Sequence, residues 1–135
     1  SSGAVFAWSY ILREIIPDGG GMYFLPRRIG LSKAKELIFT GRKVDAQEAL
    51  AMGIIDRISD PDELVSQSIA WAKELSRGSE VALALTKNIM NRSFETPAEQ
   101  IFNMGSQAQG ICYTTAEHHA SVESFLARVQ SKDIP

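Results

Sequence analysis

The sequence has very little cysteine and histidine. Cys112 is the only cysteine among 135 residues, which excludes an internal disulfide framework and a thiolate metal cluster. The two histidines, His118 and His119, are adjacent, and adjacent residues on a helix point roughly 100° apart, which makes a poor chelate. We therefore expect no metal site and interpret the histidine pair as part of a solvated helix face.

Long apolar runs and an excess of positive charge are also missing. No stretch approaches the roughly 18 apolar residues that a membrane-spanning helix needs. Residues 1–6 lack the basic start and the apolar run of a signal peptide, and the chain does not begin with methionine. The net charge of -2 gives no basic face for non-specific nucleic-acid binding. We expect a cytoplasmic protein with neither a membrane nor a nucleic-acid partner.

The composition, 44% hydrophobic and 22% charged, is that of a globular protein, and the length suffices for at most one domain with a real core. Residues 4–7 are compatible with a short buried strand, and residues 10–16 with a loop or a turn of helix. Residues 22–29 resemble a short helix that Pro26 interrupts, because proline lacks a backbone donor.

Capping signals mark the next elements. Ser32 is a candidate N-cap for a helix that stops at Gly41, and Asp45 is a candidate N-cap for a helix that ends at Gly53. Residues 54–58 (IIDRI) have the pattern of the best strand in the chain.

From Pro61 onward the pattern is helical. Apolar residues recur at three- and four-residue intervals in four segments: from Pro61 to about Ser76, at residues 81–94, from Thr96-Pro97 onward, and from Thr114 or Thr115 onward. The chain is therefore predicted to be mainly α, with one or two short strands.

A glycine-rich turn is the most informative feature of the sequence. Residues 15–30 (IIPDGGGMYFLPRRIG) lead from an apolar pair through a Pro-Asp turn and three glycines into a helical pattern. With residues 31–42 (LSKAKELIFTGR), 44–49 (VDAQEA) and 53–58 (GIIDRI), this segment resembles the crotonase superfamily, the enoyl-CoA hydratase/isomerase family. The likeness is strong over residues 15–58 and looser from Asp60 to the end.

The resemblance implies a fold and a position within it. The chain corresponds to the C-terminal part of a crotonase-like α/β spiral, with residues 1–60 as the end of the core and residues 61–135 as a helical region for oligomerisation and CoA covering. In this family the two oxyanion donors lie upstream of the region seen here. We therefore expect a fragment of an acyl-CoA-processing enzyme that has no activity alone, whose parent assembles as a homo-oligomer, a trimer or a hexamer.

The resemblance also assigns catalytic candidates. Asp18 falls where several branches place a functional aspartate, either a proton shuttle or a nucleophile; a turn or helix-cap role is the structural alternative. Tyr10, with Ser9, falls where the hydratases have a Pro-Glu pair, and a tyrosine does not replace that general base at neutral pH. Glu14, where the family often has glycine, could supply a displaced carboxylate.

The resemblance assigns cofactor-binding candidates on the C-terminal helices. Phe125 and Arg128 match a phenylalanine and a basic residue, three positions apart, that contact the nucleotide end of CoA; a core phenylalanine and a solvated charge are the alternative. Lys87 matches a family lysine, although a solvated or salt-bridging role is favoured over a ligand role. The CoA thioester is the substrate, so no separate cofactor is expected.

Three functions remain open at this point. The first is an enoyl-CoA hydratase or isomerase-like enzyme of fatty acid metabolism. The second is a non-catalytic crotonase-like module for oligomerisation or interaction; the missing Pro-Glu pair favours it, whereas Asp18 and the glycine triplet favour the first. The third is an acyl-CoA hydrolase, in which Asp18 or Glu14 places a water molecule.

Overall fold

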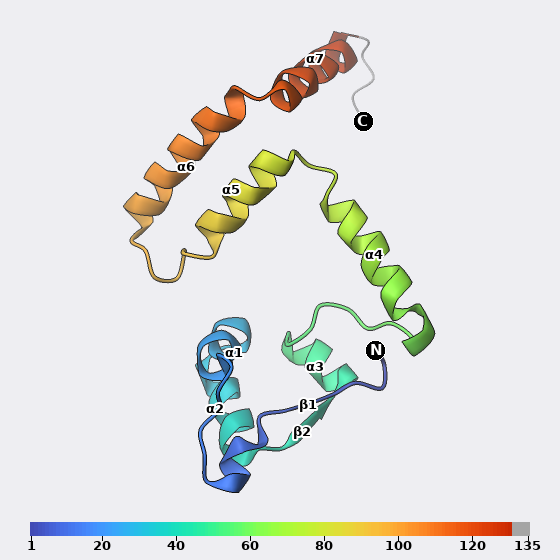
Figure 1. Cartoon of the computed structure of the whole chain (residues 1–135), viewed down its shortest axis with the longest axis vertical. Helices are drawn as coiled ribbons and strands as arrows, with labels where there is room; N and C mark the ends of the chain where they lie inside the picture. Colours follow the sequence, from blue (N-terminus) through green and yellow to red (C-terminus); the bar gives the residue numbers. More distant parts are fainter. Residues whose placement is uncertain (131–135) are drawn as a thin grey trace. The chain divides into compact units, whose positions relative to one another are not determined.

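A computed structural model describes residues 1–130, and the chain divides into two compact units. The first unit comprises residues 1–70 and the second begins at residue 71. The prediction of a mainly helical chain with short strands is confirmed (Figure 1).

The first unit combines a small sheet with short helices (Figure 1). Its elements, in chain order, are β1 (Val5–Ala7), the 3-10 helix η1 (Ser9–Arg13), α1 (Gly21–Ile29), α2 (Leu31–Thr40), β2 (Lys43–Asp45), α3 (Ala46–Met52), the 3-10 helix η2 (Pro61–Glu63) and the start of α4 (Leu64–Leu75). The strands pair antiparallel, with Phe6 opposite Val44. The sheet therefore connects the N-terminus to a segment almost 40 residues later, which fixes the start of the chain against α3.

The core of the first unit forms where the sheet meets α2 and α3. Leu37, Val44 and Ala49 are each 0% exposed, and the half-buried side chains packed against them are Phe6, Trp8, Ile29, Met52, Ile54 and Ile55. Burial of apolar surface is the dominant favourable contribution to folding. This cluster is consequently the main source of stability for the elements that hold the glycine-rich turn.

Three of the predicted end signals in this unit are confirmed by the geometry of the caps. Asp45 is the N-cap of α3, and its Oδ1 accepts a hydrogen bond from the Glu48 backbone N–H at 2.8 Å. Gly41 and Gly53 close α2 and α3 with φ values of 59° and 80°, a left-handed conformation that glycine adopts without a Cβ clash.

An ion cluster reinforces this region. The guanidinium of Arg42 donates to Glu36 in α2 and to Glu48 in α3, with shortest N–O distances of 2.6 and 2.7 Å. The hydrogen bond from Arg42 lowers the pKa of Glu36. Arg42 therefore connects α2 and α3 on either side of β2.

Several expectations for this unit are wrong. Residues 54–58 form no strand, because Ile54 and Ile55 pack on the core as irregular chain and no neighbouring strand pairs with them among residues 1–130. The sheet is built instead from β1 and β2. β1 is a strand as expected but is not buried, since Val5 and Ala7 are exposed and only Phe6 is half-buried.

The expected effects of Pro26 and Ser32 are also wrong. Pro26 lies inside α1, which continues to Ile29, because the missing N–H removes only one helical hydrogen bond. Ser32 is not the N-cap of α2. Gly30 takes that position at a sharp turn after α1, and its carbonyl accepts from the Ala34 N–H at 3.1 Å, so Ser32 lies in the first helical turn.

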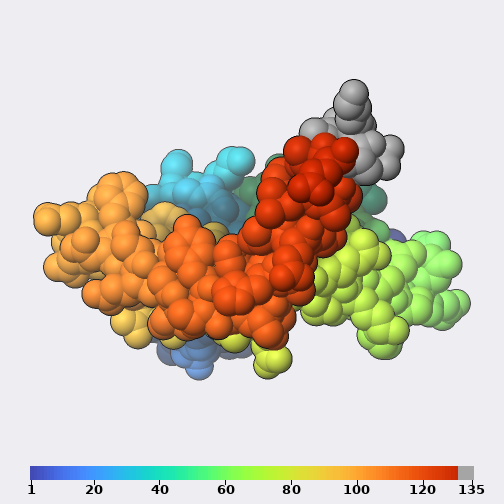
Figure 2. Space-filling model, turned by 90° about the horizontal axis from the view of Figure 1, so that it is seen from above, coloured from blue at the N-terminus to red at the C-terminus, as the bar shows by residue number. Residues whose placement is uncertain are grey.

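The second unit consists of helices. It contains the end of α4, then α5 (Glu80–Met90), α6 (Ala98–Tyr113) and α7 (Ala116–Gln130), and α5 packs beside α6 (Figure 1). No residue of these helices is buried within the described part of the chain. Side chains of α6 and α7 lie at the surface along both helices (Figure 2).

The predicted helix boundaries of this unit are close to those observed, with one exception. The helix expected over residues 81–94 ends at Met90, because Asn91 caps it and residues 91–95 form turns. The predicted start of the last helix is correct: the Thr115 hydroxyl accepts a hydrogen bond from the His118 backbone N–H at 3.2 Å.

Candidate functional site

The glycine-rich turn places Asp18 between η1 and α1. Pro17 is buried, whereas the Asp18 side chain is exposed. Gly19 and Gly20 have φ values of 57° and 83°, and a Cβ on Gly20 would lie 2.8 Å from the ring of Phe24. Glycine is required there by both backbone conformation and space. The turn thus projects the carboxylate outward from a rigid backbone at the start of α1.

Tyr10 and Asp18 are brought together by this turn. The Tyr10 hydroxyl donates a hydrogen bond to Asp18 Oδ1 at 2.6 Å. A bond between a phenol and an ionised carboxylate is short and charge-assisted. The hydrogen bond to Asp18, and then the negative charge of that carboxylate, raise the pKa of Tyr10. Tyr10 therefore keeps its proton and remains a donor throughout the neutral range.

The 3-10 helix η1, which carries Tyr10, is fixed by close contacts. A Cβ on Gly41 would lie 2.9 Å from Leu12 Cγ and 3.3 Å from Ser9 Cα, so η1 packs directly on the end of α2. A Cβ on Gly21 would lie 3.2 Å from the Trp8 ring, which places the indole against the start of α1. The supports of Tyr10 and Asp18 are consequently joined by packing as well as by the hydrogen bond.

Glu14, the third catalytic candidate, has a different position. It is the C-cap of η1, exposed and left-handed at φ 59°. Its backbone N–H donates to the Ile11 carbonyl at 3.1 Å, and within residues 1–130 no side-chain hydrogen bond joins Glu14 to Tyr10 or Asp18. Of the three catalytic candidates, the structure therefore brings Tyr10 and Asp18 into contact and leaves Glu14 apart from them.

The candidates for CoA binding lie on the helices of the second unit. Phe125 and Arg128 are exposed on α7, and their spacing of three places them on one face of that helix. Arg128 Nε donates to the Ser124 carbonyl at 3.4 Å. Lys87 is exposed on α5 and lines a hollow of about 630 Å³, whose other lining residues include Leu75, Leu83 and Met90.

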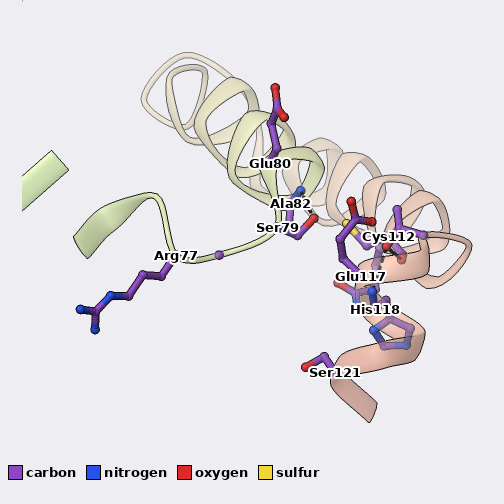
Figure 3. Close-up of a pocket in the computed structure, with 11 residues that line it drawn as sticks. Arg77, Ser79, Glu80, Ala82, Cys112, Glu117, His118 and Ser121 are labelled. Atoms are coloured by element: carbon purple, nitrogen blue, oxygen red, sulfur yellow. Dashed lines mark hydrogen bonds between the residues drawn. The ribbon is translucent and has the colours of Figure 1, made fainter. Parts of the chain in front are cut away.

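A second hollow was not predicted from the sequence. It has a volume of about 540 Å³ and lies among the start of α5, the end of α6 and the start of α7. Ser79, Cys112 and His118 line it, while the Arg77 side chain extends away from the helices (Figure 3). Its residues come from two segments, 77–82 and 109–121, and form no motif, so no sequence signal could have identified it.

The described residues carry no other obvious site. No group of three histidine, cysteine or acidic side chains is placed to hold a metal ion within residues 1–130. Over the same residues, no helix combines the length and apolarity that a membrane crossing requires. The Tyr10–Asp18 pair is therefore the strongest candidate for chemistry.

Comparison with known proteins assigns the family. The enoyl-CoA hydratase/isomerase family profile matches residues 1–132. "Probable enoyl-CoA hydratase EchA17" of Mycobacterium tuberculosis is 44% identical over 97 residues, which cover 71% of this chain and 37% of that protein. "Short-chain-enoyl-CoA hydratase" of Clostridium acetobutylicum is 30% identical over 128 residues, 95% of this chain and 49% of that protein.

Solved structures agree with this assignment. The enoyl-CoA hydratase/isomerase from Cupriavidus metallidurans superposes with a TM-score of 0.85 at 33% identity, over 93% of this chain and 47% of its own. The enoyl-CoA hydratase from Bacillus anthracis gives a TM-score of 0.88 at 28% identity, over 94% and 49%. The chain belongs to the enoyl-CoA hydratase/isomerase family, as its resemblance predicted. It spans about 37% to 49% of the length of these relatives.

Proposed function

We propose that this chain is part of an acyl-CoA-processing enzyme in which Asp18 transfers protons on the acyl group of a CoA thioester. The observation that carries the proposal is the Asp18 carboxylate, held outward on a glycine turn and hydrogen-bonded to Tyr10 at 2.6 Å. A general acid–base group must be accessible and oriented, and this carboxylate is both. Membership of the enoyl-CoA hydratase/isomerase family supports the thioester as the substrate class.

The surroundings of Asp18 suit an acyl group. Ile16, two residues before it, is 70% exposed, and Ile15 and Met22 are 53% and 51% exposed. An apolar chain near these residues would bury surface that the first unit leaves in water. The carboxylate would then act beside an apolar ligand, where water is displaced and its effect on a nearby proton is stronger.

The proposed reaction moves one proton between two carbons of the acyl group and needs no other reactant. The Asp18 carboxylate takes a proton from one carbon, and the C–H electron pair moves into the conjugated system of the thioester. The same proton then returns from the carboxyl group to another carbon, which regenerates the carboxylate. This 1,3-shift uses no oxidant, no separate cofactor and no second carboxylate, in agreement with a tyrosine at position 10.

The second unit would serve CoA binding and assembly. Phe125 offers a ring on which an adenine could stack, and Arg128 on the same face offers a cation for a phosphate. Lys87, beside its apolar hollow, is a second cation for the nucleotide. The exposed apolar side chains of α4 to α7 support a homo-oligomer, a trimer or a hexamer, with residues 61–135 as its assembly region. A cytoplasmic location belongs to the same proposal.

Turnover of a panel of enoyl-CoA thioesters by the full-length gene product tests the proposal. We expect the Asp18→Asn variant to lose about 10²- to 10⁴-fold in kcat, the usual contribution of a general acid–base group. The product of the wild-type reaction distinguishes isomerisation from hydration and hydrolysis. Chain-length preference within the panel reports on the acyl pocket.

The matched control is Asp45→Asn. It also replaces an exposed aspartate by asparagine, and asparagine is an equally good N-cap for α3, so turnover should be unchanged. If Asp18→Asn keeps wild-type kcat, Asp18 is a turn residue and the proposed chemistry is wrong.

A further inference from the structure

The hydrogen bond between Tyr10 and Asp18 has a functional consequence beyond the identity of the proton-transfer group. We propose that Tyr10 is a positioning residue whose phenol holds Asp18 Oδ1, so that Oδ2 is directed at the acyl group. This inference rests on the proposed function, because it assigns a role that acts through Asp18. Tyr10 itself exchanges no proton with the substrate.

The first support is the contrast in burial between the two partners. Asp18 is exposed, and an exposed carboxylate samples several rotamers unless a specific contact selects one. Tyr10 is half-buried, and its hydroxyl reaches Asp18 Oδ1 at 2.6 Å. The half-buried Tyr10 side chain therefore sets the orientation of the exposed Asp18 carboxylate.

The second support is that Tyr10 stands on a fixed element. η1 contacts Gly41 through Ser9 and Leu12, and Trp8, just before η1, packs against Gly21. Gly21 begins α1, three residues after Asp18, and its N–H donates to the Asp18 carbonyl at 3.1 Å. Tyr10, the donor of the hydrogen bond, and Asp18, its acceptor, thus belong to segments that pack against each other independently of that bond.

The third support is electrostatic. The adjacent Asp18 carboxylate raises the pKa of Tyr10, which keeps the phenol protonated. A group whose pKa is raised by folding contributes stability below its unfolded pKa, near 10, and loses that contribution as pH rises through the folded value. The hydrogen bond is consequently present over the whole neutral range.

The test combines side-chain order with kinetics in the full-length gene product. In Tyr10→Phe we expect the χ1 scalar couplings of Asp18, measured by NMR, to change from single-rotamer to averaged values. We also expect kcat to fall about 10- to 100-fold with KM little changed, because substrate binding does not use the phenol and misorientation of a reacting group costs about this much. Tyr113→Phe removes a phenolic oxygen in the second unit and should change neither measurement.

A second variant tests the contact without altering Tyr10. Removal of the negative charge in Asp18→Asn should lower the pKa of Tyr10 toward its ordinary value, which absorbance of the tyrosinate detects as a titration step at lower pH. The difference between wild type and variant isolates Tyr10 from the other tyrosines of the protein, Tyr23 and Tyr113 included.

The outcomes separate this inference from the proposed function. If Asp18→Asn abolishes turnover but Tyr10→Phe keeps both kcat and the Asp18 couplings, the positioning role is overturned while the proposed function stands. An unchanged tyrosine titration in Asp18→Asn overturns the positioning role as well. If Tyr10→Phe gives the expected disorder of Asp18 but Asp18→Asn keeps full turnover, the contact exists and the proposed chemistry is wrong.

Discussion

The two units differ in how far they bury their apolar side chains. In residues 1–70, Leu37, Val44 and Ala49 are fully buried, although the elements around them are short. From residue 71 to residue 130 the helices are longer, yet Phe94 and Phe102 are 75% and 72% exposed and no residue is buried. An amphipathic pattern therefore predicts a helix in both units, but burial depends on the surface that the helix finds to pack against.

The largest expected contrast between the units comes from truncating a leucine in each. Leu37→Ala removes a fully buried side chain and should destabilise the first unit by about 2–5 kcal/mol through lost burial and a cavity. Leu126→Ala in α7, at a side chain that is 50% exposed, should cost less than about 1 kcal/mol. Urea unfolding measures both values.

The two tryptophans separate these measurements. Trp8 packs on the core of the first unit, and Trp71 is the first residue of the second, so Trp71→Phe and Trp8→Phe backgrounds each report on one unit by fluorescence. Equal losses for Leu37→Ala and Leu126→Ala in the monomeric chain would contradict the difference in burial.

Glycine substitutions should have opposite signs in the two units. Gly41→Ala forces a left-handed alanine at a cost of about 1–2 kcal/mol, and its Cβ would also lie 2.9 Å from Leu12 Cγ. Gly110→Ala, in α6 with open space around it, should stabilise the helix by about 0.5–1 kcal/mol. Thermal unfolding of each variant against wild type gives the signs, and a stabilising Gly41→Ala would refute the close packing of η1 on α2.

The smallest expected contrast concerns the helix caps. Asp45→Ala removes a 2.8 Å hydrogen bond to the Glu48 N–H and should cost about 1 kcal/mol. Ser79→Ala removes a 3.4 Å bond to the Ala82 N–H, longer than the usual range, and should cost about half as much. Amide hydrogen exchange in the first turns of α3 and α5 measures both, and a larger effect at Ser79 would reverse the ranking.

Most helices were predictable because their signals are local. Asp45 and Gly53 bound α3 by chemistry contained within a few residues of each end, and Gly41 ends α2 in the same way. The strands were not equally predictable. Residues 54–58 have strand-forming residues without a partner strand, whereas residues 43–45 (KVD) carry a weak signal and form β2 because Val5–Ala7 lies alongside.

The candidate site was predictable in part for a similar reason. The glycine-rich turn identified Asp18, and the register of the family resemblance identified Tyr10 and Glu14. The sequence could not say that Tyr10 contacts Asp18 while Glu14 does not. That choice depends on η1 packing against Gly41 and on Gly19 and Gly20 reversing the chain, which involve residues up to about 30 positions apart.

The sequence by itself therefore determined the family, the helical character, the ends of several helices and which carboxylate is the candidate for chemistry, because these depend on residue types at short and fixed spacing. Only the tertiary structure decided which strands pair, which apolar faces are buried and which side chain holds Asp18. Those features arise from contacts between segments far apart along the chain, and no local propensity encodes such contacts.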